Sequence, residues 1–160
     1  MKIDIARQPL VPAFMTLFAL AVAAMCAGIP VSDTSGAVRD ALPLLGGQLA
    51  RFQAAYPVWS KFAAGFMLLF TGMCAGRITI RYNLYTVGTC LPIPLYAIVA
   101  CGIATGGNYL AGFAASMLLS LATKNYCRAF CNGYGFDAIF RASLYLGLMP
   151  LIYAPALPLL

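Results

Sequence analysis

The chain has 160 residues, of which 62% are hydrophobic and 9% charged, and its ten Lys or Arg against four acidic residues give a net charge of +6. Ordinary soluble domains are roughly a quarter charged, so this composition excludes that class and predicts an all-α membrane protein. The chain has no His, and its carboxylate side chains are Asp4, Asp33, Asp40 and Asp137. Few groups are therefore available for acid–base catalysis or metal binding, and the sequence alone predicts no molecular activity.

Charged residues delimit five predicted transmembrane helices, because one crossing needs about 20 apolar residues. The charge-free run 82–123 is interrupted by a Gly-Gly-Asn turn at 106–108, which indicates a helical hairpin. Lys61 lies near the start of the second span, where its long side chain can reach the headgroups. The predicted polytopic membrane helical bundle has spans at residues 13–29, 57–76, 84–105, 109–123 and 142–160.

Prolines modify two of these spans. Pro92 and Pro94, together with Gly88, predict a kink or a broken segment in the first third of the third helix. The last span carries three prolines and would cross as a kinked helix, with neighbouring helices satisfying the freed carbonyl groups.

The distribution of Lys and Arg predicts the orientation, because short loops rich in these residues stay cytoplasmic. An N-terminus inside the cell places seven basic residues on the cytoplasmic side, namely Lys2, Arg7, Arg77, Arg81, Lys124, Arg128 and Arg141. It leaves Arg39, Arg51 and Lys61 outside. We therefore expect a multi-pass protein with its N-terminus in the cytoplasm and residue 160 on the periplasmic side. A cleaved signal peptide is the alternative interpretation of the first thirty residues.

Two segments outside the spans are predicted to lie on the membrane surfaces. The external loop 31–55 has apolar residues at helical spacing, which Pro43 and Gly46-Gly47 interrupt, so two short interfacial helices are expected. This loop is interpreted as a connector in preference to a lid or docking surface. The cytoplasmic interfacial segment 124–141 mixes basic and aromatic side chains, a composition that suits a membrane surface.

Five basic residues are predicted to share the cytoplasmic face and are candidate ligands for the phosphate of an anionic lipid: Arg77, Arg81, Lys124, Arg128 and Arg141. The simpler interpretation is that they only determine topology. Nucleic acid is not expected as a partner, because the patch adjoins lipid and no binding motif accompanies it. Asp137 is a candidate catalytic group, but Arg141 four residues later predicts an ion pair on one helix surface.

The six cysteines show no metal-ligand or disulfide pattern, so we expect neither a metal nor another cofactor. Small residues four apart predict close packing between helices instead. These pairs are Gly72 and Gly76 in the second span and Gly102 and Gly106 in the third. Such packing suits a bundle that associates with other membrane proteins or with a second copy of itself.

Several groups of residues in the second half of the chain occur in a characteristic order. Residues 77–85 (RITIRYNLY) lead into a Pro-containing helix and then a helix ending in a basic turn, after which come 135–141 (GFDAIFR), 143–148 (SLYLGL) and 150–155 (PLIYAP). In this order residues 77–160 resemble an uncharacterised family of polytopic inner-membrane proteins of Bacteroidetes-type bacteria. The resemblance implies a bacterial inner-membrane protein that continues past residue 160, and it implies no catalytic residues.

Three functional hypotheses are open at this point. The preferred one is an accessory or assembly subunit of a bacterial envelope complex, because packing motifs are present and catalytic groups are scarce. The second is a membrane enzyme or flippase-like protein for polyprenyl-linked or phospholipid substrates, in which the arginines hold a phosphate and Asp137 acts as acid or base. The third is a solute transporter, which the lack of titratable groups in the predicted spans disfavours.

Overall fold

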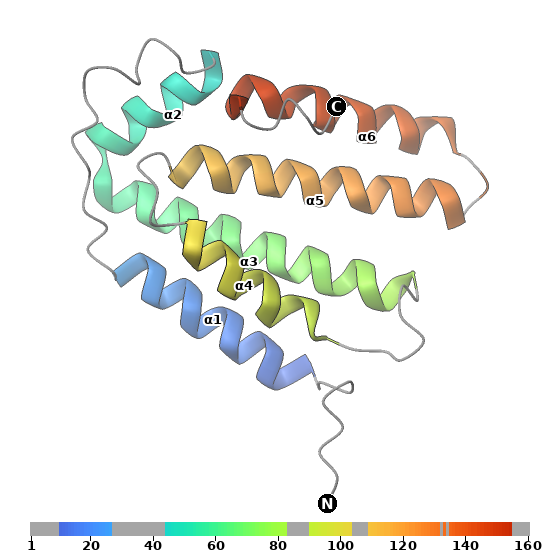
Figure 1. The fold of residues 1–160 in the computed structure, drawn as a ribbon, viewed down its shortest axis with the longest axis horizontal. Helices are drawn as coiled ribbons and strands as arrows, with labels where there is room; N and C mark the ends of the chain where they lie inside the picture. The colour runs from blue at the N-terminus through green and yellow to red at the C-terminus, as the bar shows by residue number, and fades with distance from the viewer. Residues whose placement is uncertain are drawn as a thin grey trace, which may run out of the picture.

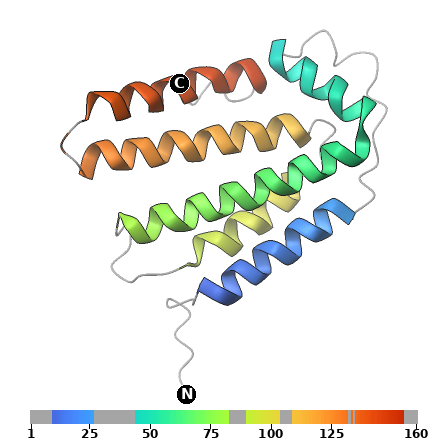
Figure 2. The same ribbon diagram turned by 180° about the vertical axis from the view of Figure 1, so that it is seen from behind.

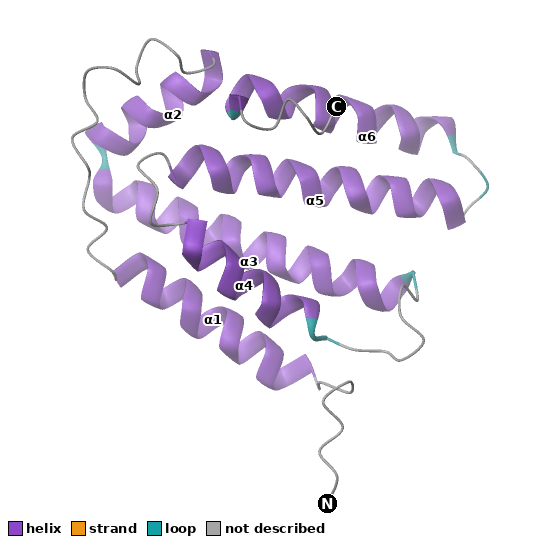
Figure 3. Cartoon of the chain, viewed as in Figure 1, coloured by secondary structure: helices purple, strands orange, loops and turns teal. Residues whose placement is uncertain are grey.

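The computed structural model describes residues 10–26, 44–82, 90–103, 109–131, 133 and 135–154. Within these residues the regular structure consists of six helices and no strands (Figures 1 and 3). The helices are α1 (Leu10–Cys26), α2 (Leu44–Ala55), α3 (Pro57–Arg81), α4 (Pro92–Ile103), α5 (Tyr109–Cys131) and α6 (Phe136–Ile152). The predicted all-α fold is confirmed for this part of the chain.

Apart from α2, the described helices (α1, α3, α4, α5 and α6) run along the length of the molecule and alternate in direction (Figures 1 and 2). α5 packs against α3 on one side and α6 on the other, and α3 also packs against α1 and α4. α2 lies across one end of the bundle, where it contacts α3, α5 and α6. We call this the α2 end. The opposite end, which contains the C-terminal turns of α3 and α5 and the start of α6, is called the basic end.

The helix boundaries follow from local chemistry. Pro57 and Pro92 occupy the first position of α3 and of α4, where the missing N–H of proline would have had no partner within the helix. Gly133 has a φ of 73°, a left-handed conformation that favours glycine, in the turn between α5 and α6. Asp137 in the first turn of α6 and Arg81 in the last turn of α3 both have the charge that the helix dipole favours.

Small residues share the helix interfaces with a few buried large ones, such as Leu17, Leu68 and Ile93, while many other large apolar side chains face outward. Along α3, Ala64, Gly72 and Gly76 are buried, whereas Trp59 is 68% exposed and Phe66 67% exposed. The same division holds in α6, where Ala138 and Ala142 are buried and Phe136, Phe140 and Leu144 are exposed. Interfaces rich in small residues allow close backbone approach, and extended apolar surfaces mark contact with lipid or with other proteins.

The two predicted packing glycines of α3 face different helices. A Cβ atom added to Gly72 would lie 2.7 Å from Leu17 Cδ1 of α1, and one added to Gly76 would lie 2.5 Å from Ile93 Cδ1 of α4. Only a residue without a side chain therefore fits at these contacts as they stand. Gly102 lies within α4, and Gly106 lies outside the described residues.

Two tyrosine–serine hydrogen bonds join α5 to its neighbours. Ser60 donates its hydroxyl proton to the Pro57 carbonyl, so the Tyr109 hydroxyl, 2.6 Å from Ser60 Oγ, is the donor of the buried α5–α3 bond. By the same reasoning Tyr96 of α4 donates to Ser116 of α5, at 3.1 Å, because Ser116 donates to Phe113.

Several predicted boundaries differ from the structure. The break expected at Gly46-Gly47 is wrong, because α2 runs through both glycines. Pro92 and Pro94 both lie in the first turn of α4, where a helix tolerates them, whereas Gly88 and the predicted start of this span lie outside the described residues, so the kink or broken segment stays a prediction. The predicted surface segment 124–141 is divided between the last turns of α5 and the first turns of α6.

The predicted spans 13–29, 84–105 and 142–160 correspond to α1, α4 and α6, which are described over Leu10–Cys26, Pro92–Ile103 and Phe136–Ile152. Among the described residues, α3 is the helix that is both long enough and apolar enough to cross a membrane by itself. α1 contains a shorter apolar stretch, Ala13–Ala23. The described residues thus establish a helical protein with one candidate membrane span, and they do not establish five.

Candidate anion-binding site

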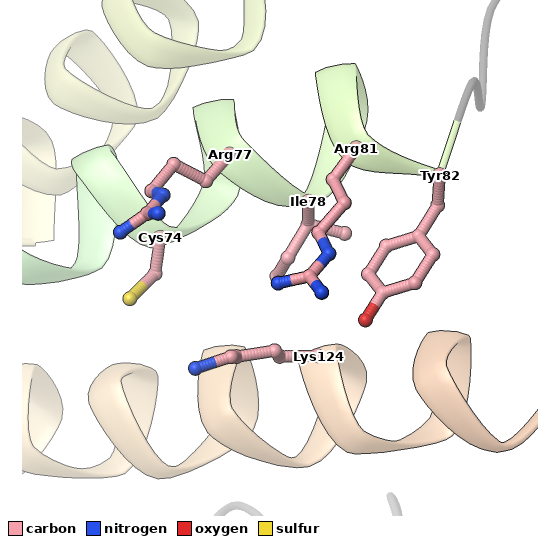
Figure 4. A pocket seen from close by; sticks show the side chains of 6 residues that line it. All are labelled: Cys74, Arg77, Ile78, Arg81, Tyr82 and Lys124. Atoms are coloured by element: carbon pink, nitrogen blue, oxygen red, sulfur yellow. The ribbon is translucent and has the colours of Figure 1, made fainter.

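A small pocket lies between α3 and α5 at the basic end (Figure 4). Its volume is about 110 Å³, and it is lined by Cys74, Arg77, Ile78, Arg81, Tyr82 and Lys124. Lys124 comes from α5, and the other lining residues come from the end of α3 or directly follow it. The pocket is therefore formed by the packing of two helices that are far apart in the sequence.

Helical periodicity places the α3 residues on one face. Positions 74, 77, 78 and 81 are spaced by three and four residues, so they lie on one side of α3. Ile78 is 6% exposed, whereas Arg77 and Arg81 are exposed at the surface. In Figure 4 the Arg81 guanidinium and the Tyr82 hydroxyl point toward α5, and the Arg77 side chain extends over Cys74. Both guanidinium groups border the space between the helices.

The pocket is strongly cationic. Three of its lining residues, Arg77, Arg81 and Lys124, carry positive charge, and no carboxylate is among the residues that line it. The Arg81 guanidinium carbon lies 6.0 Å from the centroid of the Tyr82 ring, within the range of a cation–π contact. Such a set of charge-assisted N–H donors is suited to phosphate or another oxyanion.

Asp137 does not belong to this pocket. Its carboxylate forms a two-point ion pair with Arg141, with Arg141 Nε 3.0 Å from Oδ1 and Nη2 3.0 Å from Oδ2. Both residues lie on α6, which packs on α5 and α2. The predicted i,i+4 pair is therefore present, and Asp137 is not among the residues that line the pocket between α3 and α5.

The structure brings together three of the five predicted phosphate ligands. Arg128 lies on α5 one turn beyond Lys124 and is exposed, but it does not line the pocket. Arg141 is held by Asp137. Sequence reasoning missed Cys74 and Tyr82 as lining residues, although Cys74 lies three residues before Arg77 and Tyr82 directly follows Arg81.

Two further thiols lie near the end of α5. Cys127 is half-buried and Cys131 is exposed, and both are free. Burial raises the pKa of the Cys127 thiol, the neighbouring Cys131 raises it further, and a backbone hydrogen bond lowers it. Cys127 is therefore less reactive than an ordinary exposed thiol. Among the described residues, no group of three or more His, Cys, Asp or Glu is placed to hold a metal ion.

The α2 end has a different surface. An open, almost entirely apolar groove is lined there by Phe52, Tyr56, Trp59, Phe62, Ala63 and Phe66. The rings of Phe52 and Tyr56 lie 5.6 Å apart and connect the end of α2 to the start of α3. This groove offers contact area to apolar groups but almost no polar group for recognition.

Comparisons with known proteins assign no function to the chain, so a functional assignment rests on the geometry of the site. No family model matches the chain, and neither a curated protein nor a solved structure matches it. The resemblance of residues 77–160 to a family of inner-membrane proteins stays a prediction.

Proposed function

We propose that the chain is a multi-pass membrane protein that binds the phosphate group of an anionic lipid in the pocket between α3 and α5. The observation that carries this proposal is the convergence of Arg77, Arg81 and Lys124 from two helices on a pocket with no lining carboxylate. A lipid phosphate supplies the negative charge that this arrangement requires, and basic groups beside anionic lipid each contribute about 1 kcal/mol. The proposal keeps the phosphate-binding part of the lipid-handling hypothesis without a catalytic role for Asp137.

The dimensions of α3 support the membrane placement. Trp59 and Arg77 are separated by about 27 Å along the helix axis at 1.5 Å per residue. The hydrocarbon core of a bilayer is about 30 Å thick, with aromatic residues enriched at both of its surfaces and basic residues on the cytoplasmic side. In this placement the α2 end lies at the outer surface and the basic end at the cytoplasmic surface.

The outward-facing apolar residues extend this proposal to the other helices. Phe14, Phe18 and Val22 are exposed along α1, and Ile98 and Val99 are exposed on α4. α1, α3, α5 and α6 are each at least about 25 Å long at 1.5 Å per residue, whereas α4 is about 18 Å long and covers only part of the hydrocarbon thickness. The helices that run along the long axis alternate in direction (Figures 1 and 2). A cytoplasmic N-terminus therefore agrees with a pocket on the cytoplasmic side.

Native mass spectrometry of the purified full chain with bound lipid tests the site. Lys124→Gln removes a pocket cation, and Arg128→Gln removes a cation one turn away on the same helix. We expect Lys124→Gln and Arg77→Gln to lose bound anionic lipid, while Arg128→Gln retains it. Equal losses from Lys124→Gln and Arg128→Gln would show that general charge, and not the pocket, holds the lipid.

The other two hypotheses remain predictions. Crosslinking in cells from α2 would capture a partner protein if the chain is an accessory subunit of an envelope complex. Thiol reagents that reach buried Cys90 in intact membranes would support a water-filled path and therefore a transporter.

A further inference from the structure

We infer that the pocket selects a phosphate monoester, which carries nearly two negative charges, over a phosphodiester with one. The inference rests on the proposed function and names the chemical class of its ligand. Two lipid classes carry these groups: those that end in a free phosphate, and those whose phosphate is esterified on both sides. The shared chemistry is a terminal phosphate, whether it belongs to a lipid or is free in solution.

Charge is the first reason for this selectivity. Three cations line the pocket, so a ligand with a single negative charge leaves two of them uncompensated. A terminal phosphate presents about −1.5 to −2 charges and three strong acceptor oxygens at neutral pH. Arg77 and Arg81 can each offer two parallel N–H groups and Lys124 a further donor, which together suit three oxygens better than the two free oxygens of a diester.

Size is the second reason. The pocket volume of about 110 Å³ is well below the roughly 300–1,000 Å³ of pockets that hold a drug-sized ligand. A pocket of this size suits a compact group such as phosphate, while the substituents of the phosphate leave past Arg77, Arg81 and Lys124, which are exposed at the surface. A monoester needs to direct only one substituent out of the pocket, whereas a diester must direct two past the side chains of the rim.

The selectivity predicts a pH dependence that comes from the ligand. The second pKa of a phosphate monoester is about 6, so its second charge is lost as the pH falls from about 7 to 5. The groups that line the pocket are Arg77, Arg81, Lys124, the Tyr82 hydroxyl and the Cys74 thiol. His is the side chain that ordinarily titrates in this range, and the chain has none. The variant Cys74→Ser tests for any contribution of the thiol.

The experiment compares the full chain in lipid nanodiscs of phosphatidylcholine containing equal mole fractions of phosphatidic acid, a monoester, or phosphatidylglycerol, a diester. Native mass spectrometry of the released protein measures the ratio of bound phosphatidic acid to bound phosphatidylglycerol. We expect a preference for phosphatidic acid of about fivefold or more near neutral pH, since one further charge interaction is worth about 1 kcal/mol. We expect the ratio to fall toward one at about pH 5 in the wild type and in Cys74→Ser.

The outcomes separate this inference from the proposed function. Equal binding of the two anionic lipids, both above phosphatidylcholine, would overturn the selectivity and leave the anionic-lipid site standing. Binding of neither above phosphatidylcholine would overturn both.

Two further measurements complete the test. Adding inorganic phosphate at neutral pH shows whether the ligand is a lipid phosphate or free phosphate. If inorganic phosphate displaces phosphatidic acid, the selection of a dianion is supported and free phosphate is the ligand. A preference that persists unchanged in Arg77→Gln and Lys124→Gln, with both variants monodisperse and helical by circular dichroism, would overturn the assignment to this pocket. Arg128→Gln is the matched control and should keep the preference.

Discussion

The two ends of α3 present opposite chemistry to their surroundings. At the α2 end, exposed Tyr56, Trp59 and Phe62 border an open apolar groove, which lipid chains or other apolar groups can cover. At the basic end, Arg77 and Arg81 of α3 and Lys124 of α5 line a pocket that has no carboxylate among its lining residues. In the proposed function, selective recognition therefore belongs to the basic end, and anchoring in an apolar environment belongs to the α2 end and the outer faces of the helices.

The two ends depend on one packed interior between them. Gly72 and Gly76 let α1 and α4 approach α3, and the Tyr109–Ser60 bond joins α5 to α3 near the α2 end. Because Lys124 lies on α5, the pocket exists only while α3 and α5 keep their register. Each substitution below changes one of these features and thereby tests how independent the two ends are.

The largest effect is expected from a charge on the outer face of α3. Phe66→Asp places a carboxylate on a surface that is 67% exposed and lies between the two ends. In a membrane helix this costs about 2.5–3.5 kcal/mol near the helix centre, so the variant should insert poorly and accumulate at a low level. Glycosylation-reporter or protease-protection assays of insertion measure this, with Phe66→Leu as control. Unchanged insertion and stability would show that the face is in water, which would contradict the membrane placement.

A smaller but still large loss is expected from Gly76→Ala. The new methyl group would lie 2.5 Å from Ile93 Cδ1 and 2.6 Å from Cγ1, so α4 must shift or Ile93 must change rotamer. Overpacking of this kind costs about 1–3 kcal/mol. Gly147→Ala on α6 is the matched control, because nothing lies within 4 Å of the added atom, and there alanine should be neutral or stabilising. Unfolding in detergent mixtures measures both, and equal stabilities would show that the contact at Gly76 relaxes freely.

The packing of α3 shows how far the sequence could predict this protein. The predicted span 57–76 begins at the first residue of α3, and the spacing of Gly72 and Gly76 pointed to its contacts. The break at Gly46-Gly47 was wrong because each glycine costs only about 1 kcal/mol in a helix, which the contacts of α2 with three other helices offset. Local propensity was overridden there by tertiary packing.

The candidate site shows a second limit. The sequence predicted that five basic residues share the cytoplasmic face. Which of these residues lie close together depends on the rotation and register of α5 against α3. That relation separates Lys124, which lines the pocket, from Arg128 one turn later, which does not. Arg141 lies on α6 and does not line the pocket, and it pairs instead with Asp137, as the i,i+4 spacing predicted.

A moderate loss is expected when the hydrogen bond between α5 and α3 is removed. Tyr109→Phe deletes a buried hydroxyl that donates to Ser60, and such interhelical bonds contribute about 0.6 kcal/mol on average in membrane proteins. A double-mutant cycle with Ser60→Ala isolates the coupling, and Tyr153→Phe, at an exposed tyrosine, serves as control. If loss of this bond shifts α5 against α3 along their whole length, Tyr109→Phe also weakens lipid binding in the pocket at the basic end. A coupling energy near zero would show that the bond does not hold α5 on α3.

The smallest effect is expected from Asp137→Asn. The ion pair with Arg141 is exposed on one helix surface, with side-chain exposures of 57% for Arg141 and 70% for Asp137, and pairs of this kind contribute about 0.3–0.5 kcal/mol. The variant should therefore unfold at nearly the wild-type denaturant concentration and bind anionic lipid as the wild type does. Arg141→Gln should behave in the same way, since neither residue lines the pocket. Strong loss of lipid binding or of a cellular phenotype in Asp137→Asn alone, with stability retained, would instead make the carboxylate part of the functional site. The lipid-binding site would then include α6 as well as α3 and α5. The contrast between the two ends of α3 would no longer explain lipid recognition by itself.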